Sequence, residues 1–182
     1  MALTQTGSLE RALDTDSLTA AMTGIGMAFA AQQSVEADIE DTLLFASIEA
    51  MERDDLRVLS LLVNWFFVHS RGVDAERLPE LVRSQQSVRV CALWSGLASA
   101  VATSDARFIT LATLHHGPRI DLLRVGTDFQ IEHRGEDPRF ASGPLRVPAN
   151  VLRERASDVL TPDQLAVRHS VYRSRRDRWT AP

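Results

Sequence analysis

The sequence predicts a helix-dominated α+β domain, in which a helical bundle carries a small antiparallel β element and C-terminal helices. Three observations lead to this prediction. Apolar residues recur at three- and four-residue spacing over about 17–103, as on one face of a helix. From residue 104 to about 133 the segments become β-branched, leucine-rich or alternating, which is typical of strands. The last fifteen residues hold five arginines against one acid, which indicates a basic end.

The length of 182 residues, with 45% hydrophobic residues, suits one domain with a sizeable core. We expect a flexible N-terminus over 1–16, a single globular domain over 17–166 and an Arg-rich tail over 167–182. The globular domain is expected to comprise a helical part (17–103), the β element (107–133) and a loop and helix (134–166).

Start signals divide the helical part into five helices. Ser or Asp before a helix can accept hydrogen bonds from the free N–H groups of its first turn. The expected helices are 17–32, one opened by Ser34, one opened by Asp54 or Asp55 and ending near Ser70, 74–84 opened by Asp74, and about 86–103. The third is apolar on nearly every side and is therefore expected to be the central, buried helix. Gly72 follows it, where a C-terminal cap is expected.

The β element is predicted from two leucine- and β-branched-rich runs over 107–125 that His115-His116-Gly117-Pro118 divides, a pattern typical of a hairpin. A half-exposed strand follows over 128–133. An alternative remains open, in which 105–115 is a helix that Asp105 caps. Beyond the β element, Asn150 is expected to open a helix to about Leu160, and Thr161-Pro162 to open the last one.

The order of helices 56–70, 74–84 and 87–103, followed by a hairpin, is also that of a winged helix. The composition of 87–103 argues against this, because a recognition helix should present polar side chains to base edges and Arg89 is its only base. A buried bundle helix is the alternative. The candidates for reading a DNA groove are Ser84, Gln85, Gln86, Ser87 and Arg89.

Charge is distributed unevenly in this chain of net charge −4. Residues 1–100 hold 7 Arg and 14 acids, a net of −7, whereas 101–182 hold 13 Arg and 10 acids, a net of +3. The basic tail offers guanidinium groups for phosphates and rings for stacking on bases. Alternatively, it is a solvated end, or it docks on the acidic helix 36–55 of the same or a neighbouring chain. The candidate residues for nucleic-acid or partner binding are Arg168, Tyr172, Arg173, Arg175, Arg176, Arg178 and Trp179.

Catalytic and metal-binding signals are weak. The chain has no Walker loop, GxGxxG motif or nucleophile elbow. In a strand, His115 and His116 would point to opposite faces, so one metal ion could hardly bind both. A second cluster of carboxylates could hold Mg²⁺, although the nearby arginines indicate exposed ion pairs instead. The carboxylates of that cluster are Asp128, Glu132, Glu136 and Asp137.

The compartment expected for the chain is the cytoplasm. Cys91 is the only cysteine, which excludes an intrachain disulfide and favours a reducing compartment. The sequence has no apolar run long enough for a membrane span and no secretory signal at its start, so no contact with a membrane is expected.

The leading hypothesis is a non-enzymatic cytosolic regulatory protein that binds nucleic acid, a protein partner or both, in the manner of an antitoxin or a repressor. No cofactor and no metal are predicted. One alternative is a helical adaptor or homo-oligomer that associates through the Trp94 face or through the small residues Ala21, Gly24 and Ala28. Another is a metal-dependent enzyme that acts on phosphodiesters through Asp121, Asp128 or His116.

Overall fold

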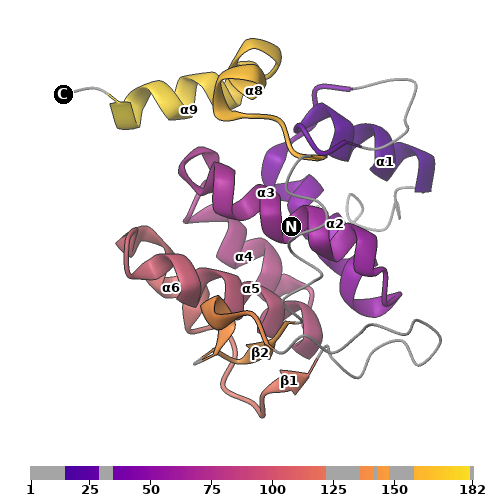
Figure 1. Cartoon of the computed structure of the whole chain (residues 1–182), viewed down its shortest axis with the longest axis vertical. Helices are drawn as coiled ribbons and strands as arrows, with labels where there is room; N and C mark the ends of the chain where they lie inside the picture. Colours follow the sequence, from indigo (N-terminus) through magenta and orange to yellow (C-terminus); the bar gives the residue numbers. More distant parts are fainter. Residues whose placement is uncertain (1–14, 29–34, 122–135, 142, 148–157, 181–182) are drawn as a thin grey trace, which may run out of the picture.

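The computed structural model describes residues 15–28, 35–121, 136–141, 143–147 and 158–180. It is mostly helical, and the predicted helical bundle is confirmed (Figure 1). The strand expected over 128–133 and most of the helix expected from Asn150 lie outside the described residues. The α-helices are α1 (Thr15–Gly24), α2 (Ile39–Glu52), α3 (Leu56–His69), α4 (Arg77–Ser84), α5 (Val88–Ala102), α6 (Ile109–Ala112), α8 (Pro162–Arg168) and α9 (Ser170–Thr180). The 3₁₀ turns are η1 (Ser70–Gly72), η2 (Ala106–Phe108) and η4 (Pro138–Phe140), and the strands are β1 (Ile120–Asp121) and β2 (Leu145–Arg146).

Side-chain caps set the starts of the main helices. Helix α2 begins four residues later than expected, because Asp38 accepts a hydrogen bond from the N–H of Asp41 at 3.0 Å. Asp55, one of the two predicted caps, opens α3. Thr161 opens α8 as predicted, in a capping box with Gln164.

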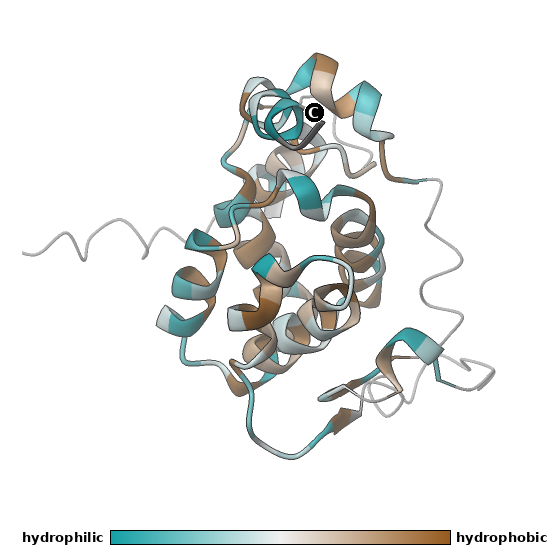
Figure 2. Cartoon of the chain, turned by 90° about the vertical axis from the view of Figure 1, so that its left-hand side faces the viewer, coloured by the Kyte–Doolittle hydropathy of each residue, from teal (hydrophilic) through white to brown (hydrophobic). Residues whose placement is uncertain are grey.

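Helix α3 is the central helix of the bundle, as its apolar sequence predicts. In Figure 2 the apolar residues of the helices are turned towards one another at the middle of the bundle. Trp94 of α5 packs edge-on against Phe66 of α3, with ring centroids 5.4 Å apart. Helix α5 is therefore the buried bundle helix that its composition favoured. The α3 side chains that are fully buried include Leu61, Leu62, Val63, Trp65 and Phe66.

Residues 106–112 of the segment 105–115 are helical, so the first strand of the predicted hairpin is wrong and the alternative of a helix that Asp105 caps is confirmed over these residues. Asp105 accepts a hydrogen bond from the N–H of Arg107 at 3.2 Å and opens η2, which continues into α6. Phe108 and Leu111, three residues apart, are both fully buried, which is a helical period that the β-branched composition hides. The wing of a winged helix is accordingly not confirmed.

The β structure that the model describes is small. Strands β1 and β2 pair in parallel, with Ile120 opposite Leu145 and Asp121 opposite Arg146, rather than as the two arms of an antiparallel hairpin. The β2 segment lies directly on α5, since a Cβ atom added at Gly96 would lie 2.9 Å from the Cβ of Leu145. The two short strands thus cover one side of the bundle and form only a small sheet.

The last predicted helix is in fact two, α8 and α9, because the backbone at His169 leaves the helical region with φ −124° and ψ 109°. Figure 1 shows this helix pair at one end of the bundle, apart from α6 and the strands. The segment that leads into α8 is joined to the segment that follows α1 by an isolated antiparallel bridge between Val159 and Met27. The tail is therefore a packed layer of the fold over 170–180.

Most residues proposed for an adaptor interface pack within the chain, although Ala28 is exposed. Trp94 is fully buried and Ala21 is 7% exposed. A Cβ atom at Gly24 would overlap the carbonyl of Val35, so the small residue there admits the chain's own backbone. In the part of the chain that the structure describes, no helix is both long and apolar enough to cross a membrane.

Candidate functional site

Tyr172 anchors the C-terminal layer to the core. Its side chain is 2% exposed, and its hydroxyl lies 2.8 Å from Nδ1 of His69. His69 Nε2 lies 2.8 Å from the carbonyl oxygen of Leu160. A carbonyl only accepts, so Nε2 carries the proton and Nδ1 accepts from the Tyr172 hydroxyl. Burial lowers the pKa of His69 to about 4 and raises the pKa of Tyr172 to about 12, so both are neutral at pH 7.

A second buried histidine holds the backbone of the same tyrosine. His169 is 1% exposed, and its Nδ1 accepts a hydrogen bond from the N–H of Tyr172 at 3.2 Å. Its Nε2 donates to the carbonyl oxygen of Ala37 at 2.9 Å. The Tyr172 ring packs against Gly72, where a Cβ atom would overlap it. Gly72 therefore serves close packing, in addition to ending η1 near the expected cap position.

Arg175 joins α9 to α2 through a buried ion pair. Its two guanidinium nitrogens lie 2.7 Å and 3.2 Å from the carboxylate oxygens of Glu40, whose side chain is fully buried. Arg175 also donates to the carbonyl oxygen of Gly72 at 3.0 Å, and Glu40 accepts from the N–H of Asp74 at 2.8 Å. The tail thus docks on the acidic helix of the same chain, one of the alternatives that the sequence offered.

Glu36 completes the contact between α9 and the acidic segment before α2. Its carboxylate accepts hydrogen bonds from the hydroxyl of Ser170 at 2.5 Å and from the Ser170 N–H at 3.0 Å. These two bonds are the main reason why the pKa of Glu36 is lowered. The start of α9 is therefore held by an anion, which its unpaired N–H groups favour.

Three of the other predicted tail residues, Arg168, Arg173 and Arg178, are exposed, and among the described residues no ion pair holds them. Arg176 pairs with Asp163 at 2.8 Å. Trp179 lies in the last turn of α9. The structure therefore divides the predicted set, with Tyr172 and Arg175 turned inward and three arginines exposed.

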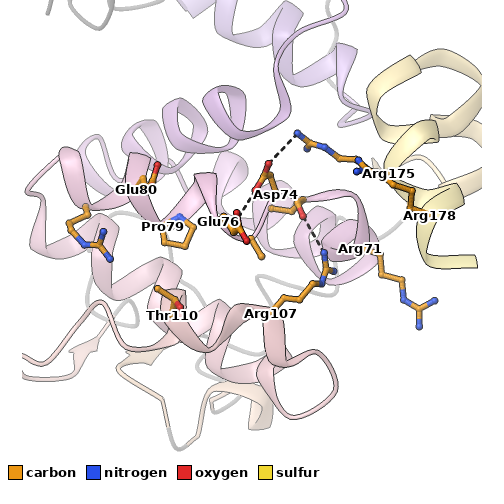
Figure 3. A pocket seen from close by; sticks show the side chains of 12 residues that line it. Arg71, Asp74, Glu76, Pro79, Glu80, Arg107, Thr110, Arg175 and Arg178 are labelled. Carbon is orange, nitrogen blue, oxygen red and sulfur yellow. Dashed lines mark hydrogen bonds and ion pairs between the residues drawn. The ribbon is translucent and has the colours of Figure 1, made fainter.

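A cleft of about 890 Å³ lies between η1, α4, η2, α6 and α9 (Figure 3). Arg107 is braced within it, donating to Asp105 at 2.6 Å and to the carbonyl oxygen of Val73 at 3.5 Å. Arg175 is held there by Glu40 and lies 3.9 Å from Asp74. The ionisable residues of the lining are Arg71, Asp74, Glu76, Glu80, Arg83, Arg107, Arg175 and Arg178.

The metal and catalytic candidates are not brought together in the described part of the chain, where no three metal-ligating side chains form a cluster. His115 Nε2 lies 3.0 Å from the carbonyl oxygen of Pro118, within its own turn. Asp137 pairs with Arg139 at 2.8 Å, an ion pair of the kind that the sequence favoured. Asp128, Glu132 and His133 lie outside the described residues.

Sequence reasoning missed Glu40, although the signal was present. Glu40 precedes Leu43 and Leu44 by three and four residues, so it belongs to the buried stripe of α2. A carboxylate on such a stripe needs a buried cation. The tail contains this cation, Arg175, 135 residues after Glu40. Nothing in the sequence identifies which of the five tail arginines pairs with Glu40.

A scan against protein-family models, a search of curated proteins and a search of solved structures each find nothing that matches this chain. The C-terminal layer and the cleft beneath it are therefore the features from which a function can be inferred.

Proposed function

We propose that the chain is a non-enzymatic regulatory protein that binds nucleic acid through the exposed arginines of α8 and α9. One observation carries this proposal: α9 uses Tyr172 and Arg175 to hold itself to the bundle, while Arg168, Arg173 and Arg178 remain exposed without an ion pair in the described part of the chain. Guanidinium groups presented on a fixed helix pair suit phosphates, which accept their paired N–H bonds.

The contact is expected to be with the phosphate backbone rather than with the bases. The Tyr172 ring is buried and offers no face on which a base could stack. Phosphate contacts bring strong salt dependence and little sequence preference. A regulator of the repressor or antitoxin type remains the functional class that we propose, and its sequence preference would have to come from elsewhere in the chain.

The test measures binding of fluorescent duplex DNA and of RNA at several salt concentrations. The triple variant R168Q/R173Q/R178Q removes the three exposed charges of the tail. A matched control, R53Q/R57Q/R83Q, removes three exposed charges from α3, α4 and the end of α2, so both variants shift the net charge from −4 to −7. Each lost phosphate contact lowers the slope of log affinity against log salt by about 0.9 for duplex DNA.

We expect the tail variant to lose affinity and about 3 units of this slope, because each charge contributes about one unit. The control should behave like the unaltered chain. Substitution is preferable to truncation at Ala166, since truncation would also remove the buried Tyr172. The proposal fails if neither nucleic acid binds at low salt, or if both triple variants lose affinity equally.

A further inference from the structure

We propose that the cleft beneath α9 binds a small phosphorylated molecule, with its phosphate held by Arg71, Arg107 and Arg178 and its hydrogen-bond donors held by Glu76 and Glu80. A nucleotide combines these two kinds of group. This site shares Arg178 with the proposed nucleic-acid contact, whereas the other two arginines of that contact, Arg168 and Arg173, lie outside the cleft lining. The cleft volume of about 890 Å³ falls within the range of small-molecule sites.

Arginines from three separate segments line the cleft. Arg71 belongs to η1, Arg107 to η2 and Arg178 to α9, so residues far apart in sequence share this lining. Figure 3 shows Arg107 near the middle of the view, with Arg71 and Arg178 to its right. Several cations in one lining raise the local potential and favour an anion with several acceptor oxygens.

Of the five arginines in the cleft lining, two are held in fixed positions and three, Arg71, Arg83 and Arg178, are exposed. Arg107 is paired with Asp105 and Arg175 with the buried Glu40. Arg71 and Arg178 are exposed, and in the described part of the chain no ion pair occupies either. A ligand would contact Arg107 and Arg175, which are already fixed, together with the exposed Arg71 and Arg178. Because part of the site is already ordered, less conformational entropy is lost when the ligand binds.

The opposite half of the lining has the other sign. Glu76 and Glu80 of the α4 region are exposed, and in the described part of the chain no hydrogen bond or ion pair engages their carboxylates. The buried side chains of Val73 and Pro79 provide an apolar surface between the charged groups. A purely anionic ligand would be repelled at this half, whereas amine or hydroxyl donors would be bound.

Isothermal titration calorimetry of the full chain provides the test, with inorganic pyrophosphate, the four ribonucleoside diphosphates and adenosine as separate probes. We expect at least one diphosphate to bind with a Kd of about 1 mM or tighter, and adenosine to bind more weakly. The variant R71Q/R178Q should weaken this binding at least about tenfold, because two charge-assisted contacts are lost. The control R168Q/R173Q should leave it within about twofold, since the same charge is removed outside the cleft.

The acidic half of the lining has its own test. E76Q/E80Q should weaken nucleoside diphosphate binding but leave pyrophosphate binding unchanged or stronger, because only the nucleotide has donors for these carboxylates. Absence of binding by every phosphorylated probe would overturn the proposal, as would equal losses in R71Q/R178Q and its control. Nucleic-acid binding is expected to weaken in R168Q/R173Q, so failure of one proposal can be told from failure of the other. Circular dichroism and thermal unfolding establish that each variant is folded.

Discussion

The centre of the bundle and its C-terminal layer are held together by different interactions. Helix α3 is buried by apolar packing on nearly every side. The contact between the rings of Phe66 and Trp94 is one example. Helix α9 is instead held by polar anchors, namely the hydroxyl of Tyr172 on His69 and the guanidinium of Arg175 on Glu40. A helix with few apolar residues can thus be part of the fold on one face and remain free for a ligand on the other.

The largest effect is expected where the buried ion pair is broken. Glu40→Gln removes the negative charge that Arg175 faces and leaves a guanidinium that is only 16% exposed without its counter-ion. Breaking such a buried pair costs about 3–5 kcal/mol. Urea unfolding followed by circular dichroism measures the loss. A loss below about 1 kcal/mol would mean that the layer is held by packing, as α3 is.

Acidification should loosen the layer through His69. Its pKa is about 4 in the folded chain and near 6.5 in its ordinary state, so the unfolded chain binds the proton more readily between these values. The contribution of neutral His69 to the free energy of unfolding is therefore fully present above pH 6.5 and is lost as pH falls from 6.5 through about 4. The total loss is about 3 kcal/mol. Unfolding measured from pH 7 to pH 5 should show the slope, and His69→Gln should flatten it. An unchanged slope in His69→Gln would contradict this account.

Overpacking at Gly72 gives a middle-sized effect. An added methyl group would overlap the Tyr172 ring, so Gly72→Ala must displace either the ring or η1. Such insertions typically cost about 1–3 kcal/mol. Thermal unfolding measures the cost, and Gly143→Ala is a control of the same chemistry away from the layer, because an added Cβ there would lie 3.6 Å from the nearest neighbouring atom. Equal shifts in the two variants would argue against a close contact between Gly72 and the ring.

Removal of one hydroxyl tests the smallest of the anchors. Tyr172→Phe keeps the ring but leaves Nδ1 of His69 without its donor, and a buried unsatisfied acceptor costs about 1–3 kcal/mol. The pKa of His69 should stay well below its ordinary value in this variant, because burial of the ring is the main cause of its lowering. Urea unfolding gives the stability, and proton NMR of the imidazole gives the titration. A fully stable Tyr172→Phe chain would show that the ring alone anchors α9.

Periodicity in the sequence predicts the apolar part of this fold well, because burial repeats every three or four residues in α3 and α5. It fails at 105–115, where β-branched residues in a short helix resemble a strand. It also cannot pair Glu40 with Arg175, since a contact between residues 135 positions apart leaves no local pattern. The basic character of the tail was evident from its composition, but the inward side of α9 follows only from tertiary packing.

The most direct test compares R175Q with R178Q, two neutralising substitutions one turn apart on α9, by urea unfolding and by nucleic-acid binding. We predict that R175Q loses about 3 kcal/mol of stability, because the buried Glu40 keeps only the more distant Arg77, at 3.6 Å, as a counter-ion, while R178Q changes stability by less than about 0.5 kcal/mol and weakens binding. Equal losses of stability in the two variants, or a stable R175Q that binds nucleic acid less well than R178Q, would contradict the division of α9 into an inward anchor and an outward binding surface.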